Sequence, residues 1–278
     1  MSAAPREFAG LDLSHPRLMG IVNVTPDSFS DGGRHAGAAA AIDHGLALAA
    51  AGAAVLDVGG ESTRPGAEPV PVEEEVRRVV PVVQALARAG HCVSVDTRRA
   101  AVMRAAIDAG ARIVNDVTAL TGDRDSLDVV AAARVAVVLM HMQGEPRTMQ
   151  AAPRYDDVVA EVGAYLAARV DACRARGMRD ADLCVDPGIG FGKTLEHNIA
   201  LLRGLPRLRM PGVALLVGVS RKGFIGTLSG IAEPAARVAG SLAAGLAAID
   251  GGADILRVHD VAETRQALDV WRGIGRPV

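Results

Sequence analysis

Short apolar runs and amphipathic segments alternate along the whole chain. The runs are rich in Val, Ile and Leu, and each has the length of a buried β-strand. They occupy residues 18–24, 54–60, 92–97, 112–117, 135–142, 183–188, 214–220 and 255–260. In the segments that follow them, apolar residues recur at three- and four-residue spacings, which is the period of an α-helix. These helical segments are 38–51, 73–88, 100–109, 125–133, 157–176, 195–202, 235–249 and 262–271.

A strand followed by a helix, eight times over, predicts a (β/α)₈ (TIM) barrel of the α/β class. Such a barrel takes ~250 residues, whereas a doubly wound sheet has about six strands and would leave part of the chain unexplained. Because no linker-like change of composition divides the sequence, we expect one domain over residues 1–278, with the barrel core at about 17–272. The leading segment REFAGLDLSHP, residues 6–16, predicts a short hairpin or cap before the barrel.

The composition fits this fold and narrows the range of partners. Half of the residues are hydrophobic but only 3% are aromatic, so the core is built from Ala, Val, Leu and Ile, as in parallel strands under helices. The formal net charge of −2 gives no reason to expect nucleic acid or an anionic membrane as a partner. The apolar runs are shorter than the ~18 residues of a membrane span. Three scattered cysteines, without a CxxC pair or a recognisable secretory leader, favour a cytoplasmic protein.

Most of the predicted strands end in polar residues. In a barrel all strands run parallel, so these groups gather at the C-terminal mouth, where barrel enzymes carry their active sites. In the run ILRVHD, the two-residue period of a strand puts Arg257 and His259 on the same face as Ile255. For His141, a packed imidazole at the end of a strand is the simpler interpretation. The polar strand ends are Asn23, Glu61, Ser62, Thr63, Arg64, Asp96, Asn115, Asp116, His141, Asp186, Ser220, Arg221, Lys222, Arg257 and His259.

The sequence contains no established phosphate-loop or zinc motif. The segment DPGIGFGKT ends like a phosphate loop, but that motif requires glycine where Pro187 stands, and the spacing does not match a dinucleotide fingerprint. The seven histidines form no HExxH pair and no cluster with cysteine, so zinc is not expected. A Mg²⁺ ion would need no such motif, because it can be held by one amide oxygen, such as that of Asn23, and otherwise by water and substrate phosphates.

Two carboxylates, an amide and an ammonium group at the mouth suit a flat nitrogen heterocycle. Carboxylates accept hydrogen bonds from ring N–H groups, and an amide can donate or accept. These residues are Asp96, Asn115, Asp186 and Lys222. An internal ion-pair network, for instance between Lys222 and Asp186, is the alternative interpretation.

Two long loops follow the first two predicted strands. TPDSFSDGG at residues 25–33 and ESTRPGAEPV at residues 61–70 are dense in turn-forming residues and poor in core-forming ones. At the mouth of a barrel such loops serve as lids, and Phe29 and Arg64 are the candidate contacts with a ligand. An ordinary solvated connection is the alternative.

Eight segments of the chain carry a family resemblance. They are MGIVNVTPDSFSDGG, DVGGESTRPGA, SVDTRR, IVNDV, LMHMQGEPRTMQ, DPGIGFGKT, VGVSRKGFIG and RVHDV. In sequence and in order they resemble those of the bacterial dihydropteroate synthases, from about residue 8 to about residue 267. The resemblance implies a barrel, usually homodimeric, that joins 4-aminobenzoate to (7,8-dihydropterin-6-yl)methyl diphosphate and releases diphosphate and 7,8-dihydropteroate. Members of this family act in folate biosynthesis and are the target of sulfonamides, which mimic the aminobenzoate.

The resemblance also implies a role for individual residues at the mouth. The pterin would be held by Asp96, Asn115, Asp186, Lys222 and Arg257. The diphosphate would contact Thr63, Arg257 and His259, together with a Mg²⁺ ion bound by Asn23. The 4-aminobenzoate would contact Arg64, Pro65, Phe191, Ser220 and Lys222. The catalytic contributions are assigned to Asp96, Lys222, Arg257 and His259. From spacing alone, Phe191 could equally pack in the core.

The chemistry implied by the family is a dissociative displacement at the pterin methylene. Diphosphate leaves, the electron-rich ring stabilises the positive methylene, Asp96 offsets the positive charge, and the neutral aromatic amine attacks without a strong general base. Two other functions stay open at the level of sequence: a pterin-binding methyltransferase, and a pterin-binding paralogue without synthase activity. The two long loops and the residues for a diphosphate end favour the synthase.

Overall fold

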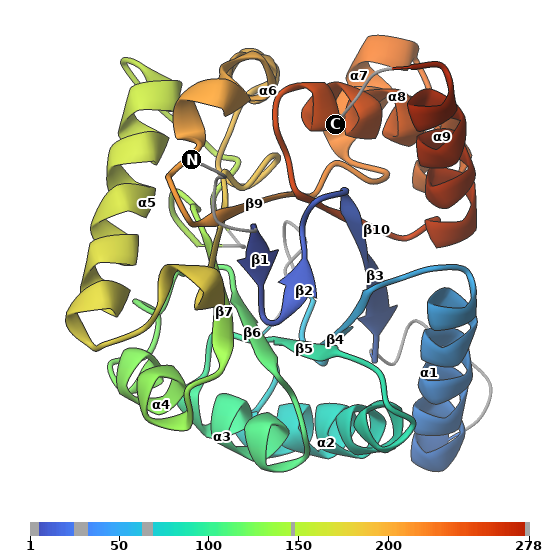
Figure 1. The fold of residues 1–278 in the computed structure, drawn as a ribbon, viewed down its shortest axis with the longest axis vertical. Helices are drawn as coiled ribbons and strands as arrows, with labels where there is room; N and C mark the ends of the chain where they lie inside the picture. The colour runs from blue at the N-terminus through green and yellow to red at the C-terminus, as the bar shows by residue number, and fades with distance from the viewer. Residues whose placement is uncertain (1–5, 25–32, 63–68, 146–147, 276–278) are drawn as a thin grey trace.

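Eight parallel strands close into a barrel at the centre of the molecule (Figure 1). The computed structural model describes residues 6–24, 33–62, 69–145 and 148–275. Each strand pairs in parallel with the next one along the chain, and β10 closes the ring against β3. The strands are β3 (Arg17–Asn23), β4 (Val55–Gly59), β5 (Val93–Asp96), β6 (Ile113–Asp116), β7 (Ala136–Met140), β8 (Leu183–Asp186), β9 (Ala214–Val217) and β10 (Ile255–Val258). The predicted (β/α)₈ barrel is confirmed.

Helices surround this barrel on its outer side (Figure 1). They are α1 (Gly33–Ala50), α2 (Val72–Arg88), α3 (Ala100–Asp108), α4 (Ser126–Ala133), α5 (Val158–Ala175), α6 (Leu195–Leu208), α7 (Gly223–Ser229), α8 (Val238–Asp250) and α9 (Val261–Gly273), with 3₁₀ turns η2 (Asp180–Asp182) and η3 (Pro234–Arg237). Local capping fixes some of their starts. The Asp157 carboxylate accepts from two backbone N–H groups at the start of α5, and the Thr194 hydroxyl accepts from His197 at the start of α6.

Several helices begin or end a few residues away from the predicted bounds: α1 begins at Gly33 rather than at residue 38, and α8 begins at Val238 rather than at residue 235. Two further differences have identifiable reasons. Helix α6 continues six residues past the predicted end at residue 202, although Gly204 and Pro206 are poor helix formers. Leu205 and Leu208 are buried there, so packing outweighs local propensity. Helix α7 was not predicted, because its seven residues, GFIGTLS, include two glycines and are too few to show a helical period.

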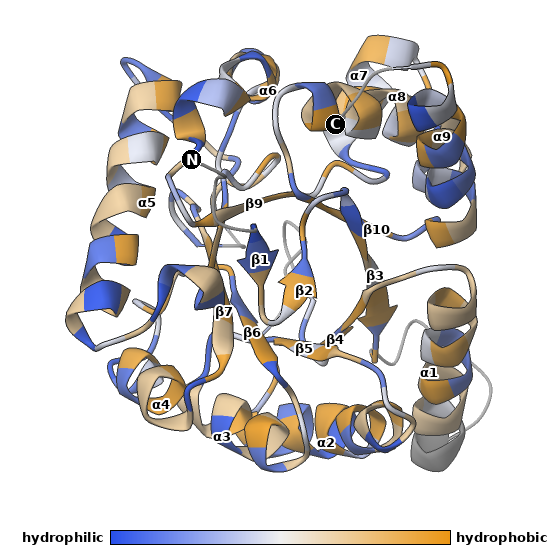
Figure 2. Cartoon of the chain, in the orientation of Figure 1, coloured by the Kyte–Doolittle hydropathy of each residue, from blue (hydrophilic) through white to orange (hydrophobic). Residues whose placement is uncertain are grey.

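The alternation of side chains along each strand divides the apolar core in two. Along β10, Ile255 belongs to the cluster inside the barrel, whereas Leu256 and Val258 join the cluster between strands and helices. Arg257 lies on the inner side, where it reaches Asp57 of β4. Figure 2 shows that the surrounding helices carry apolar and polar residues side by side, as amphipathic segments do. The interior of the barrel is therefore apolar below and charged toward the mouth.

An antiparallel hairpin closes the N-terminal end of the barrel, as the sequence predicted. It consists of β1 (Glu7–Phe8) and β2 (Leu11–Asp12), which lie across the barrel axis in Figure 1. Its turn, Ala9 and Gly10, has φ angles of 53° and 77°, the pattern of a tight type I′ hairpin. The Ala9 N–H donates to Ala181 at 3.0 Å, and Phe8 is fully buried in the inner cluster. The hairpin thus plugs the end opposite to the mouth.

Replacing Phe8 with leucine is expected to lower the free energy of unfolding by about 1–2 kcal/mol without changing ligand binding. The reason is that the ring fills the lower barrel, far from the polar strand ends. Urea denaturation measures the loss, and Glu7→Ala on the exposed side of the same strand serves as the control. An equal loss in both variants would contradict the plugging role of Phe8.

Candidate active site

The strand register brings the predicted mouth residues to one level of the barrel. Asn23 at the end of β3 lies opposite Gly59, Gly59 lies opposite Asp96, and Asp96 lies opposite Asn115. Four consecutive strands therefore present Asn23, Asp96 and Asn115 at the same height, with a glycine between the first two. A Cβ on Gly59 would lie 3.5 Å from the Cβ of Asp96, so the missing side chain leaves room beside the carboxylate.

A buried ion cluster links the two ends of the chain at this level. The Arg257 Nε donates to Asp57 Oδ2 at 2.6 Å, and its Nη2 donates to Asp96 Oδ2 at 2.7 Å. The Asn115 amide also donates to Asp57 Oδ2, at 3.0 Å. Asp57 is fully buried, and its other oxygen has no hydrogen-bond partner. One guanidinium thus holds two carboxylates from neighbouring strands in a fixed geometry.

The electrostatics of this cluster follow from burial. Loss of solvation raises the pKa of Asp96 to about 7; Arg257 opposes this shift, and the negative charge of Asp57 adds to it. Burial disfavours the charged guanidinium of Arg257, but Asp57 and Asp96 outweigh that effect and raise its pKa. Arg257 therefore stays charged, while Asp96 can change its protonation state near neutral pH.

A second group of residues lies beside this cluster, at the end of β8 and on the loops after β8 and β9. Asp186 is 6% exposed, its Oδ1 accepts from Gly188 N at 2.7 Å, and burial raises its pKa. The Lys222 Nζ donates to the Ile189 carbonyl and lies 4.8 Å from the ring centre of Phe191. Burial lowers the pKa of Lys222 to about 8, although Asp186 opposes the shift. The charges of Lys222 and Asp186 act on each other's pKa, but the ion pairs found here among the described residues join Arg257 to Asp57 and Asp96. The alternative of an internal ion-pair network therefore holds for Asp96, with Arg257 rather than Lys222 as the cation.

Gly218 connects the two groups. A Cβ at this position would lie 3.8 Å both from the Cβ of Arg257 and from the Nζ of Lys222. The absence of a side chain therefore lets the two cations face the same space at the mouth.

Ser220 and His259 form a third contact at the mouth. Ser220 Oγ lies 3.0 Å from His259 Nδ1, and the His259 backbone N–H donates to the same hydroxyl at 3.2 Å. The Ser220 hydroxyl thus contacts both the backbone and the side chain of His259, which fixes the orientation of the imidazole at the mouth.

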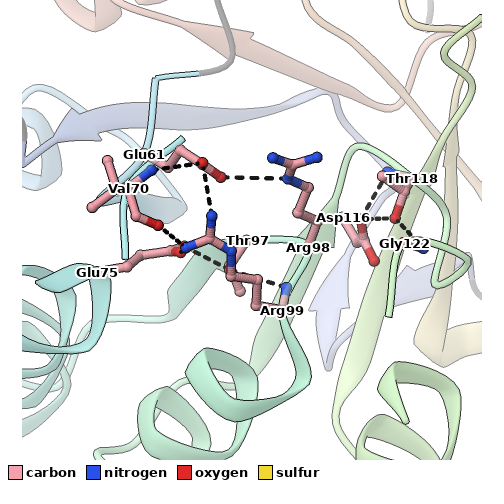
Figure 3. Close-up of polar contacts among 9 residues, drawn as sticks. All are labelled: Glu61, Val70, Glu75, Thr97, Arg98, Arg99, Asp116, Thr118 and Gly122. Carbon is pink, nitrogen blue, oxygen red and sulfur yellow. Dashed lines mark hydrogen bonds and ion pairs between the residues drawn. The ribbon is translucent and has the colours of Figure 1, made fainter. Parts of the chain in front are cut away.

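Three predicted site residues, Thr63, Arg64 and Pro65, and the loop residue Phe29 lie outside the described residues. Just before them, Glu61 joins a polar network at the mouth (Figure 3). Its Oε1 accepts from Val70 N at 3.2 Å and from Arg99 Nη2 at 3.1 Å, and its Oε2 lies 3.4 Å from Arg98 Nε. The network ties the base of the loop after β4 to the loop after β5.

Asp116 and His141 are explained by local structure. Asp116 accepts from the N–H and hydroxyl groups of Thr118 at 2.7 Å each and from Leu120 N at 3.0 Å, which holds the turn after β6 (Figure 3). His141 is 8% exposed and meets the ring of Tyr165 edge-on, with 5.0 Å between ring centres. Burial lowers the pKa of His141 to about 3, so it is a neutral, packed imidazole.

Asp57 is the site residue that sequence reasoning missed. It stands inside the run AVLDVGG, where a carboxylate interrupts an apolar strand in the same way as Asp96 interrupts CVSVDT. The two-residue period places it on the inner face, so the signal was present in the strand itself.

The closed barrel and its charged mouth define a barrel enzyme that binds a small polar ligand at the carboxyl ends of its strands. Residues 19–259 match the family model described as pterin binding enzyme. Together with the similarities given next, this shows that the chain belongs to the dihydropteroate synthases.

Three relatives illustrate the similarity. Dihydropteroate synthase of Escherichia coli K12 is 49% identical over 261 residues, covering 94% of this chain and 92% of the relative. The enzyme of Xanthomonas albilineans was solved with 4-aminobenzoic acid (54% identity, 98% of each chain, TM-score 0.91) and with 7,8-dihydropteroate (52%, 95% of each chain, 0.86). The Yersinia pestis enzyme was solved in a sulfonamide drug complex (46%, 95% of this chain and 96% of that chain, 0.88).

Membrane-spanning helices and acidic or His/Cys metal clusters are both absent among the described residues. None of the described helices is both long and apolar enough to cross a membrane. Among the same residues, no group of three or more His, Cys, Asp and Glu side chains is arranged to hold a metal ion.

Proposed function

We propose that this protein is a dihydropteroate synthase, a transferase of folate biosynthesis. It joins (7,8-dihydropterin-6-yl)methyl diphosphate to 4-aminobenzoate, with release of diphosphate and formation of 7,8-dihydropteroate. The observation that carries the proposal is the buried cluster of Arg257 with Asp57 and Asp96, set beside Asp186 and Lys222 at the mouth of the barrel. Nearly full-length similarity to enzymes of this activity supports it.

The pterin is assigned to the innermost residues. Carboxylates that lie in a dry pocket at fixed positions suit the amino and N–H edge of a pterin, because buried polar groups need partners. The planar guanidinium of Arg257 offers a flat surface against the ring, which a lysine would not. The pterin residues are Asp96, Asn115, Asp186, Lys222 and Arg257, and Asp57 supports them by orienting Arg257 and Asn115.

The diphosphate is assigned to the cationic and hydrogen-bonding side of the mouth. Arg257 and His259 act as donors, Thr63 is assigned to the same substrate group from the family resemblance, and Asn23 would hold a Mg²⁺ ion through its side-chain oxygen. A single neutral oxygen ligand fits a Mg²⁺ ion whose other ligands are water and substrate phosphate, since this ion dehydrates reluctantly. When bound, the ion neutralises charge on the diphosphate.

The 4-aminobenzoate is assigned to the outer residues of the mouth. Phe191 provides a flat wall, Ser220 and Lys222 provide polar contacts for the substrate, and Arg64 and Pro65 come from the loop after β4. Lys222 lies against the ring of Phe191 and faces the same space as Arg257, which is assigned to the pterin. Lys222 therefore stands where the two substrates would meet.

The reaction breaks the bond between the methylene carbon and the diphosphate oxygen and forms a bond from that carbon to the amine nitrogen. Arg257 and His259 stabilise the charge that grows on the departing oxygen. Asp96, as a carboxylate, offsets positive charge on the pterin. The amine loses one proton after attack, so no strong general base is required. Asp57, Asn115 and Asp186 are buried at the site, so little water reaches it to intercept the cation.

The test is product formation by the purified chain. Adding the pterin diphosphate, 4-aminobenzoate and Mg²⁺ is expected to give 7,8-dihydropteroate and one diphosphate per turnover. Omitting Mg²⁺ is expected to stop turnover, and adding it back is expected to restore it. Binding of the pterin without turnover would favour a non-catalytic paralogue, and transfer of a methyl group from a methylated folate would favour a methyltransferase.

The pH profile of kcat/KM for the pterin substrate is expected to be bell-shaped, with limbs near pH 7 and pH 8. Below pH 7 Asp96 is protonated and cannot offset positive charge, so activity rises as pH increases through this value. Above pH 8 Lys222 loses its proton, so activity falls. Lys222→Arg keeps the charge at high pH and should remove the alkaline limb. An alkaline limb unchanged in that variant would contradict the assignment.

We further infer a cytoplasmic homodimer. Leu228 of α7 is 62% exposed, and Val270 of α9 and Ile274 just after it are 62% and 75% exposed, so these apolar side chains are available as contacts for a second subunit. Cys173 and Cys184 are buried free thiols, in keeping with a reducing compartment. Sedimentation analysis tests the dimer: Leu228→Glu should weaken it, and a wild-type monomer at micromolar concentration would contradict it.

A further inference from the structure

The loop between β8 and α6 is held by side chains from several parts of the chain. Its four consecutive carbonyl groups each accept a hydrogen bond from a different side chain. The Ile189 carbonyl accepts from Lys222, the Gly190 carbonyl from Gln150 at 2.6 Å, the Phe191 carbonyl from Lys193 at 2.9 Å, and the Gly192 carbonyl from Tyr155 at 2.9 Å.

This loop also lies against the loop after β7, backbone to backbone. Gly188 and Gly192 have positive φ angles, and a Cβ on either would approach the carbonyl oxygen of His141 or Gln143 to 2.0 or 2.3 Å. No other residue fits such an approach. The conformation of the loop is therefore specified twice, by glycine geometry and by side-chain donors.

Lys193 is the most costly of these donors to bury. It is 3% exposed, and its Nζ lies 2.9 Å from the Phe191 carbonyl, 3.3 Å from the His141 carbonyl and 3.1 Å from His141 Nδ1. None of the ion pairs among the described residues includes Lys193. Its partners are neutral acceptors, since His141 is uncharged. Burial lowers the pKa of Lys193 to about 7, although the charge of Asp186 opposes the shift. Lys193 therefore holds the loop mainly through its contacts with these acceptors.

Tyr155 provides a second hold without any charge. Its hydroxyl donates to the Gly192 carbonyl, and its ring meets His197 edge-on, with ring centres 4.9 Å apart. The chain has only two tyrosines, and the other, Tyr165, packs on His141 but donates to the Thr118 carbonyl at 3.1 Å. The two tyrosines thus both lie near His141, but Tyr155 donates to the loop after β8 and Tyr165 to the turn after β6.

We propose that Lys193 and Tyr155 are positioning residues for the 4-aminobenzoate site, because they fix the backbone on which the ring of Phe191 is carried beside Lys222. Neither residue touches the reacting atoms. The inference rests on the proposed function, since it assigns Phe191 to that substrate. The carbonyls of Phe191 and Gly192 are both held, so the backbone that carries the ring cannot shift away from Lys222 without breaking a hydrogen bond.

Steady-state kinetics with each substrate varied in turn tests the proposal. Lys193→Met should raise KM for 4-aminobenzoate about 10- to 100-fold, and Tyr155→Phe about 3- to 10-fold, as expected for loss of a charged and a neutral hydrogen bond. Tyr155→Phe should leave KM for the pterin diphosphate within about twofold, because no charge is removed. The positive charge of Lys193 is also felt by Asp186, so Tyr155→Phe isolates the geometric effect. Tyr165→Phe is the matched control and should leave KM for 4-aminobenzoate unchanged.

A double-mutant cycle shows whether the two residues act through Phe191. In a Phe191→Ala background, Tyr155→Phe should raise KM for 4-aminobenzoate less than twofold more, since the ring to be positioned is gone. Full additivity, or equal increases of KM for both substrates, would overturn the inference while leaving the synthase assignment intact. A wild-type chain that forms no 7,8-dihydropteroate would instead reject the proposed function itself. Amide hydrogen exchange over residues 188–192 should become faster in Lys193→Met. Unchanged exchange would count against the role of Lys193 in fixing this loop.

Discussion

Replacing Arg257 with alanine is expected to lower kcat/KM by about 10³-fold or more. Arg257 is the only partner cation recorded for Asp57 and Asp96 within the described residues, so its loss removes a donor to the substrate and leaves two buried carboxylates uncompensated. Removing one partner of a buried ion pair typically costs about 3–5 kcal/mol in the free energy of unfolding. The pKa of Asp96 should rise further, because Arg257 now holds it down.

Calorimetric binding separates the roles of Arg257 and its neighbour His259. Arg257→Ala should weaken binding of both an isolated pterin and inorganic diphosphate with Mg²⁺. His259→Ala should weaken mainly the diphosphate, since this residue lies with Ser220 rather than in the ion cluster. Arg257→Lys keeps the charge but not the planar fork, so it should recover folding more than activity. Equal loss of pterin binding in the Arg257→Ala and His259→Ala variants would contradict this division.

Asp57→Asn is expected to lower kcat/KM by about 10²-fold while leaving the fold intact. The amide has the shape of the carboxylate, but it no longer holds Arg257 by charge or accepts from Asn115 in the same way. The negative charge of Asp57 raises the pKa of Asp96. Removing it should therefore move the acid limb of the pH profile to lower pH. The profile and urea denaturation are measured together.

Ser94→Ala is the matched control for this change. Ser94 is paired in register with Asp57, is fully buried, and its hydroxyl has no hydrogen-bond partner. Its replacement should change neither kcat/KM nor the acid limb by more than about twofold. An acid limb that stays in place or moves upward in Asp57→Asn would refute the electrostatic role assigned to Asp57.

The sequence predicted the barrel because short apolar strands and amphipathic helices can each be recognised from the local order of apolar and polar residues. It also placed Arg257 on the same face as Ile255, since strand alternation decides the face, and the structure shows that this face is the inner one. The sequence did not reveal which charged side chains pair with one another. The partners of Arg257 are set by strand order and register, so Asp57 was overlooked although it stands in a recognised strand. The buried state of Lys193 depends likewise on the packing of two loops, which no local pattern encodes.

The ion cluster has a consequence for how the chain acquires its activity during synthesis. Arg257 is 200 residues from Asp57 and 161 from Asp96, so the cluster requires the last strand of the barrel. A nascent chain that has made only the earlier strands holds the carboxylates without their cation. Contacts of such long sequence separation are slow to form. Ligand binding then stabilises only the finished molecule. A chain that ends before β10 therefore lacks Arg257 and His259, which are the cation of the ion cluster and the donors assigned to the diphosphate.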